Sequence, residues 1–142
     1  MAGQLSVWSA NRVLNKLLRG EDYSVTPSYW IAAFKATDAA ALRANTPGAA
    51  SEVSAVGYAR IEIRGGTALN FTASTAAFTQ VSGLLAWAPA VDAWGTVTFV
   101  AVMDSATIGA GNVVVLGALA SPKVVDAGDT LKLPSGLFTV GL

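Results

Sequence analysis

The longest run of strand-forming residues in the 142-residue chain covers residues 94–104. It is rich in Thr, Val and Phe, whose branched and aromatic side chains pack well on a pleated strand. Successive side chains of a strand point to opposite faces, so Val97, Phe99, Ala101 and Met103 share one apolar face. The opposite face begins with two threonines and ends with two valines. We therefore predict a central strand whose second half is covered on both sides.

Shorter segments with strand character fill much of the remaining chain. We count about eight to ten short strands, with turn signals at roughly the spacing of a β-sandwich. Residues 112–120 are strongly apolar and are predicted to form a hairpin with residues 94–104. In residues 58–64 the alternation predicts that Tyr58 and Arg60 face solvent. The predicted fold class is all-β, a jelly-roll-like β-sandwich with one short N-terminal helix.

The predicted helix covers residues 9–19. Ser9 is a suitable N-cap, and Gly20 can adopt the left-handed conformation that ends a helix. Four residues form one apolar stripe: Val13, Leu14, Leu17 and Leu18. A helix of about three turns is marginal alone, so we expect it to pack as a lid over one end of the β core. A membrane-surface helix is disfavoured because the segment is short and lies beside Glu21 and Asp22.

The first eight residues have apolar side chains without helical spacing. Residues 1–8 are therefore interpreted as an N-terminal arm, and residues 9–142 as a single β-sandwich domain that includes the helix. An apolar arm is either tucked into its own domain or lent to a neighbour, and both alternatives are open. Leu5, Val7 and Trp8 are the predicted interface residues. Deleting residues 1–8 is expected to leave the sandwich folded and to abolish assembly.

The segment from residue 37 to residue 52 is rich in alanine. Residues 39–44 can form one helical turn, and Pro47 and Gly48 then stop it. We interpret the whole segment as an exposed excursion that tolerates insertions.

Charged residues make up 13% of the chain, about half of the usual ~25%. Nine basic and nine acidic residues give a formal net charge of zero, which disfavours nucleic-acid binding. A surface with so few charges is expected to be partly hidden in an assembly. No apolar run has the ~20 residues of a membrane span, and no signal-peptide pattern precedes the first strand. We expect a protein that is made in the cytoplasm and then joins an assembly, with no membrane partner.

Functional groups for catalysis are scarce. The chain has no cysteine and no histidine, which excludes thiolate nucleophiles, histidine acid–base catalysis and the usual zinc sites. An oxygen-ligand calcium site is conceivable at Asp126 and Asp129 together with Asp104. Carboxylates at this spacing are, however, ordinary in turns, and we favour that interpretation. We predict no catalytic, cofactor-binding or metal-binding residues, no cofactor, and no enzymatic activity.

The tryptophans offer one further alternative. Aromatic side chains can line a sugar-binding face, but in a chain of this size they are more often core or interface residues. The four tryptophans are Trp8, Trp30, Trp87 and Trp94.

Four short motifs, in this order and spacing, resemble a family of small tailed-bacteriophage virion proteins. Members of this family are often labelled tail-fibre proteins, and the chain is also similar to phage capsid cement proteins. The resemblance runs from the helix through Leu133 and is weakest over residues 69–88. The motifs are Glu-Val-Ser and Gly-Tyr-Ala-Arg within residues 52–60, Trp-Gly-Thr-Val at 94–97, Gly-Ala-Leu and Ser-Pro-Lys within 117–123, and Ala-Gly-Asp-Thr-Leu at 127–131.

The resemblance implies a jelly-roll-like sandwich, a place in a virion and no catalytic residues. The leading hypothesis is a capsid cement (decoration) protein on the capsid surface, which binds the phage major capsid protein and itself as a homodimer or homotrimer. The alternative is a tail-fibre or receptor-binding domain that recognises a host surface glycan or protein. The compact chain, without a visible shaft, favours the first hypothesis.

Overall fold

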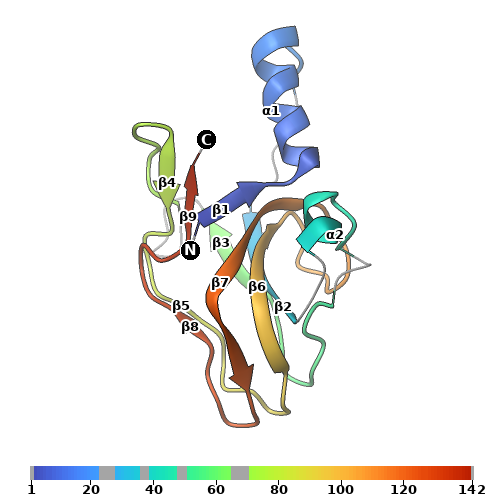
Figure 1. Ribbon diagram of the computed structural model, residues 1–142, viewed down its shortest axis with the longest axis vertical. Coiled ribbons are helices and arrows are strands. Elements are labelled where there is room, and N and C mark those ends of the chain that lie inside the picture. The colour runs from blue at the N-terminus through green and yellow to red at the C-terminus, as the bar shows by residue number, and fades with distance from the viewer. Residues whose placement is uncertain (1, 23–27, 36–38, 48–50, 65–70, 142) are drawn as a thin grey trace.

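A computed structural model describes residues 2–22, 28–35, 39–47, 51–64 and 71–141. Strands dominate these residues, and the only long helix follows the first strand (Figure 1). The elements are β1 (Ala2–Leu5), α1 (Val7–Arg19), β2 (Ser28–Lys35), α2 (Ala39–Arg43), β3 (Ile61–Arg64), β4 (Phe78–Gln80), β5 (Leu85–Ala86), β6 (Gly95–Met103), β7 (Val113–Val125), β8 (Lys132–Leu133) and β9 (Thr139–Gly141).

The main sheet has seven strands in the order β3-β2-β6-β7-β1-β9-β4, and it curls so that β5 and β8 lie opposite it as a second, two-stranded layer (Figure 1). The strand β6 pairs antiparallel with β2 on one side and with β7 on the other. Its last four residues, 100–103, are all buried. The predicted central strand, its hairpin partner, and the all-β, sandwich-like class with a short N-terminal helix are therefore confirmed.

The first strand is an interior strand of the sheet. β1 pairs antiparallel with β7 and parallel with β9, so it joins the last strand to the rest of the sheet. A Cβ atom at Gly3 would lie 2.7 Å from Val115 Cγ1 and 2.9 Å from the Thr139 carbonyl oxygen, which explains why this position needs glycine. Of the two alternatives for the predicted arm, the structure shows the first, in which the arm is tucked into its own domain. We now expect deletion of residues 1–8 to damage the sheet, against our expectation from the sequence.

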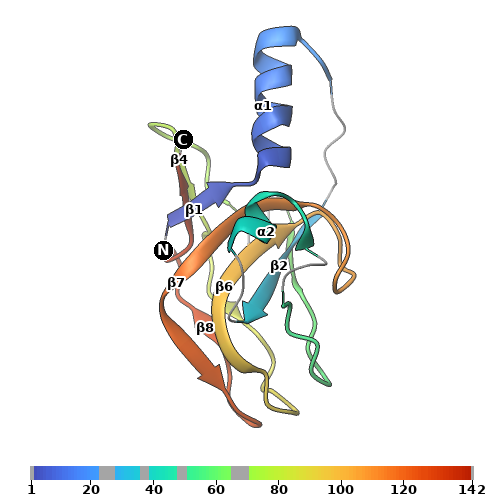
Figure 2. The ribbon, with the colours of Figure 1, turned by 45° about the vertical axis from the view of Figure 1, so that its right-hand side comes forward.

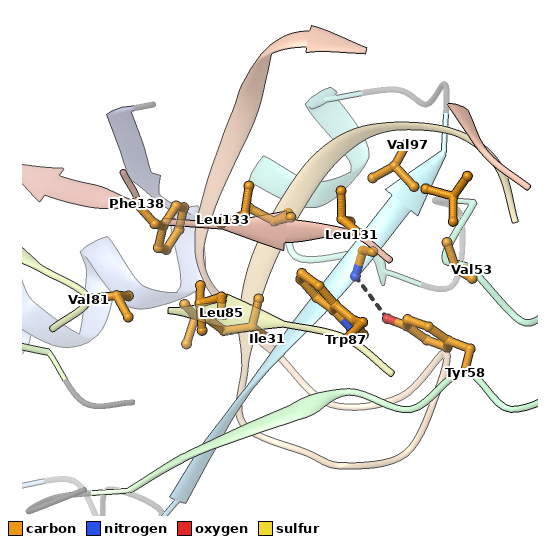
Figure 3. Packing of buried hydrophobic residues seen from close by; sticks show 14 of the residues in the cluster. Ile31, Val53, Tyr58, Val81, Leu85, Trp87, Val97, Leu131, Leu133 and Phe138 are labelled. Atoms are coloured by element: carbon orange, nitrogen blue, oxygen red, sulfur yellow. Dashed lines mark hydrogen bonds between the residues drawn. The ribbon is translucent and has the colours of Figure 1, made fainter. Parts of the chain in front are cut away.

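The larger hydrophobic cluster lies between the two layers. Figure 3 shows Leu85 of β5 and Leu133 of β8 in one cluster with Ile31 of β2 and Val97 of β6, all of them buried. Burying such side chains contributes about 1.5–3 kcal/mol each relative to exposure. This cluster is the main reason that the two layers stay together.

A smaller cluster covers the opposite face of the central strands. Here Leu42 of α2 packs, fully buried, with Phe34 of β2 and Met103 of β6. The predicted helical turn at residues 39–44 is confirmed. Its interpretation as part of an exposed excursion is wrong for Ala41 and Leu42, which are buried, while the other four residues are exposed. Leu42 covers an outer face of the sheet that would otherwise meet water.

A β-bulge at Thr98 changes the face of the first residues of β6. The pairings with β2 and with β7 both pass from Val97 to Phe99 without Thr98, whose hydroxyl donates to the Lys35 carbonyl oxygen at 2.9 Å. Val97 therefore packs in the larger cluster and Phe99 against the smaller one. The prediction that they share a face is wrong, because one extra residue shifts the alternation. On β7 the irregularity includes Pro122, which has no N–H for the ladder.

A matched pair of substitutions tests this core. Val97→Asp should prevent folding, because an unpaired buried charge costs about 3–5 kcal/mol, a large part of a typical 5–15 kcal/mol of stability. Val124→Asp, on the neighbouring strand at a side chain that is 64% exposed, should leave the protein folded. Circular dichroism and urea unfolding of the two variants measure the difference, and a folded Val97→Asp protein would contradict the assigned core.

Candidate interaction surface on helix α1

Helix α1 is fixed to the body at its first turn. Ser6 is the N-cap: its Oγ accepts a hydrogen bond from the Ser9 backbone N–H at 3.2 Å and donates one to the Val113 carbonyl oxygen. The Ser6 N–H also donates to the Val114 carbonyl oxygen at 3.2 Å. The predicted N-cap, Ser9, is therefore wrong by one turn, and the helix begins at Val7 instead of residue 9. The predicted end is confirmed, since Gly20 adopts φ 68°.

Beyond that first turn, α1 stands away from the two β layers (Figures 1 and 2). Its three leucines are exposed, Leu14 by 52%, Leu17 by 74% and Leu18 by 79%, while Val13 of the predicted stripe is half-buried. With Val7 the three leucines form what we call the α1 stripe. The expected role of the helix as a lid over the β core is therefore wrong, because the face that would cover the core lies in solvent.

The spacing of these residues is that of a helix-packing seam. Val7, Ala10, Leu14 and Leu17 follow one another at intervals of three and four residues, the a and d positions of a heptad. Covering each exposed leucine would contribute up to about 1.5–3 kcal/mol. A 13-residue helix depends for its stability on packing of its apolar face. Within the single chain, this apolar face of α1 has no such packing over its exposed leucines.

The opposite side of α1 is polar and satisfied locally. The Arg12 guanidinium lies 4.7 Å from the ring centroid of Trp8. Lys16 pairs with Asp22, and Arg19 with Glu21 at 2.8 Å. These exposed contacts contribute little to stability. They do show that the charges of this region lie away from the α1 stripe.

The three predicted interface residues have different surroundings. Leu5 is half-buried against the larger core cluster, and Trp8 is half-buried beside Arg12. Val7 is 48% exposed and belongs to the α1 stripe. The structure brings Val7 together with the leucines of the helix, which we had predicted from their spacing to pack on the β core.

Glu52, Tyr58 and Arg60 form a buried polar cluster. Arg60 donates from Nε to Glu52 Oε1 and from Nη2 to Oε2, both at 2.7 Å, and the two side chains are 0% and 4% exposed. Arg60 Nη1 also donates to the carbonyl oxygens of Ser105 at 2.6 Å and Ala110 at 3.0 Å. The cluster therefore holds the loop between β6 and β7 onto the segment that precedes β3.

The remaining bonds add another contact with the β6–β7 loop and connect the cluster to β2. Glu52 Oε2 accepts from the Gly109 N–H at 2.7 Å. The Tyr58 hydroxyl accepts from the Ala33 N–H at 2.8 Å, the dashed line in Figure 3, and its O–H points to Glu52 Oε1 at 3.4 Å. Burial raises the pKa of Tyr58 far above its ordinary value. The prediction that Tyr58 and Arg60 face solvent is wrong. One signal for the polar cluster was available in the sequence, since both residues are polar in a chain with few charges.

The three aspartates considered for calcium have turn roles. Asp104 accepts from the Asn112 N–H at 2.6 Å and from Asn112 Nδ2 at 2.8 Å. Asp129 Oδ2 accepts from the Asp126 N–H at 3.0 Å, within a single turn. Among the described residues, no three acidic side chains gather in a way that could hold a metal ion.

Two of the tryptophans are core residues. Trp87 and Trp94 are 4% and 3% exposed and meet edge to face, with ring centroids 6.3 Å apart. They border a cavity of about 180 Å³ that Arg60 also lines. Rings buried to this degree provide no exposed platform for stacking a sugar.

The chain is an all-β, sandwich-like protein whose N-terminal helix leaves an apolar face uncovered. Neither of the helices in the described ranges has the length and apolarity to cross a bilayer. Residues 4–141 match the family described as podophage GP4 fiber I protein gp80, and the chain belongs to this family. No curated protein matches the chain. It is a phage structural protein of fibre type, located in the virion, and the resemblance to phage virion proteins is confirmed.

The buried ion pair can be tested against an exposed one. Glu52→Ala should lower the free energy of unfolding by about 3–5 kcal/mol, because it leaves the Arg60 charge buried without its partner. Glu21→Ala removes the partner of Arg19 on the surface and should change stability by less than about 1 kcal/mol. Urea unfolding measures both. Similar values for the two variants would show that the buried pair has no special role.

The Tyr58 hydroxyl should make the free energy of unfolding depend on pH in the alkaline range. The pKa of Tyr58 is raised in the folded state. The contribution of its protonated hydroxyl to the free energy of unfolding is therefore complete below the unfolded-state pKa of about 10 and is lost as pH rises above that value. Tyr58→Phe should weaken this alkaline decline, and at neutral pH it should cost about 1–3 kcal/mol by leaving the Ala33 N–H unpaired. Tyr29→Phe, at a half-buried tyrosine of β2, is the control. Unfolding curves at several pH values check this, and identical pH profiles for Tyr58→Phe and the unmodified protein would refute it.

Proposed function

We propose that this chain is a non-enzymatic subunit of a phage fibre and that the α1 stripe joins it to other proteins of the particle. The observation that carries the proposal is the exposure of Leu14, Leu17 and Leu18 on a helix that stands clear of its own body. The description of the family, a fiber protein, supports the location in a fibre.

A non-catalytic role is supported by the use of the buried polar groups. Glu52 and Arg60 bind each other and backbone groups of the β6–β7 loop, and both are closed off from solvent. Their bonds hold a loop in place and leave neither side chain directed at a substrate.

The same loop is our proposed contact with a host surface glycan or protein. It is anchored from inside by Arg60, while Thr107 and Ile108 at its tip are exposed. A loop that is already held in one conformation loses little entropy on binding, which favours recognition.

The second candidate is a capsid cement protein that binds the major capsid protein on the capsid surface. The zero net charge and the 13% of charged residues favour it, because a weakly charged subunit can lie in a dense lattice with little repulsion. Such a protein stabilises the assembled shell by mass action, since it binds that state only. Many symmetric copies then add avidity.

The copy number in purified phage particles separates the two candidates. Quantitative mass spectrometry against the major capsid protein should give a few to tens of copies for a fibre and hundreds for a shell protein. Labelling with an antibody against this chain in electron microscopy locates it on the tail or the head. Hundreds of copies distributed over the head would overturn the fibre proposal and support the cement role.

Incorporation into particles should depend on the α1 stripe. In phage that carry Leu17→Asp and Leu18→Asp together, we expect particles to lack this protein, because two charges would be buried in the contact. The matched control is Asn15→Asp with Lys16→Asp on the polar side of the helix. Quantitative immunoblotting of particles measures incorporation, and normal incorporation of the leucine variant contradicts the use of α1.

A further inference from the structure

We infer that the partner of the α1 stripe is α1 of further copies of this chain, so that the helices form a short bundle of two or three. This inference rests on the proposed use of α1 in assembly and specifies the partner. The observations behind it are the repeat along the helix, the placement of charges around it and its separation from the body.

The repeat selects a helix as the partner. Val7, Ala10, Leu14 and Leu17 occupy successive a and d positions, and Val13 and Leu18 flank this seam at g and e. Side chains at these positions fit into the holes of a helix that carries the same repeat. A second copy of this chain carries the same repeat because its sequence is the same, so its Leu14 and Leu17 occupy the same a and d positions.

The charges permit pairing of identical helices. Arg12, Lys16 and Arg19 fall at f, c and f positions, on the side of the helix away from the seam. Two of them pair with Asp22 and Glu21 within the same chain. Like charges at e and g would repel each other across a self-paired seam. Here the e and g positions of the helix hold Asn11, Val13 and Leu18, and no charge.

The geometry leaves room for several bodies. The hydrogen bonds that fix α1 come from Ser6, at its base, while the leucines lie further along a helix that projects from the β layers (Figure 2). Neighbouring helices can therefore approach the seam without displacing a strand. A helix of 13 residues gains the stability that it lacks alone when its seam is covered.

Analytical ultracentrifugation of the purified full chain tests the inference. The unmodified protein should form dimers or trimers with rising concentration. Leu17→Asp should raise the dissociation constant roughly tenfold to a hundredfold, as expected for the loss of one buried leucine per helix. Asn15→Asp adds the same charge outside the seam and should leave assembly unchanged. Circular dichroism verifies that both variants keep the β-rich body.

Cross-linking provides a second measurement that does not weaken the seam with a charge. The chain has no cysteine, so Leu14→Cys introduces a single thiol near the middle of α1. Mid-helix positions meet whether the paired helices run parallel or antiparallel. Leu14→Cys should therefore give disulfide-linked dimers under mild oxidation, while Lys16→Cys, away from the seam, should not.

A chain that stays monomeric at all concentrations, or an oligomer that Leu17→Asp leaves intact, overturns the inference. If the purified chain is monomeric while α1 variants are still lost from particles, self-pairing is wrong and the proposed function stands. If the chain pairs through α1 while the same variants enter particles normally, self-pairing is correct and the proposed route of attachment is wrong.

Discussion

The bidentate pair of Arg60 and Glu52 is the interaction on which the arrangement of the body depends. Both side chains are almost completely buried, and their charges are tolerable because each side chain bonds to the other and to backbone groups. Tyr58 connects the pair to the Ala33 N–H of β2, and the backbone groups of Ser105 and Gly109 connect it to the β6–β7 loop. One polar cluster thus joins three parts of the chain that are far apart in sequence, and apolar packing closes around it.

Local patterns predicted the elements that are made from local interactions. The β-branched run around Val100 became the central strand, Gly20 ended the helix, and the alanine-rich segment formed a helical turn around Leu42. In each case the deciding contacts lie within a few residues or on one periodic face. The pairing of β6 with β7 was also predictable, because the two strands are apolar and follow one another in the chain, joined by the loop of residues 104–112.

Non-local pairing explains what the sequence did not reveal. The position of β1 between β7 and β9 depends on partners more than a hundred residues away. The bulge at Thr98 depends on irregularities shared with both neighbouring strands. The burial of Arg60 depends on Glu52 and on a loop that follows β6. Alternation of side chains within one strand carries no information about such partners, so Arg60 was predicted to face solvent.

The low charge of the chain and its uncovered helix have a common physical explanation. Surfaces that remain in solvent need charge for solubility, while surfaces that become buried in an assembly lose stability with each unpaired charge. In α1 the charges of Lys16 and Arg19 are confined to one side, and Leu14, Leu17 and Leu18 lie exposed on the other. A monomer gains nothing from this separation. In an assembled fibre, the leucines would supply the contact and the polar side would remain in water.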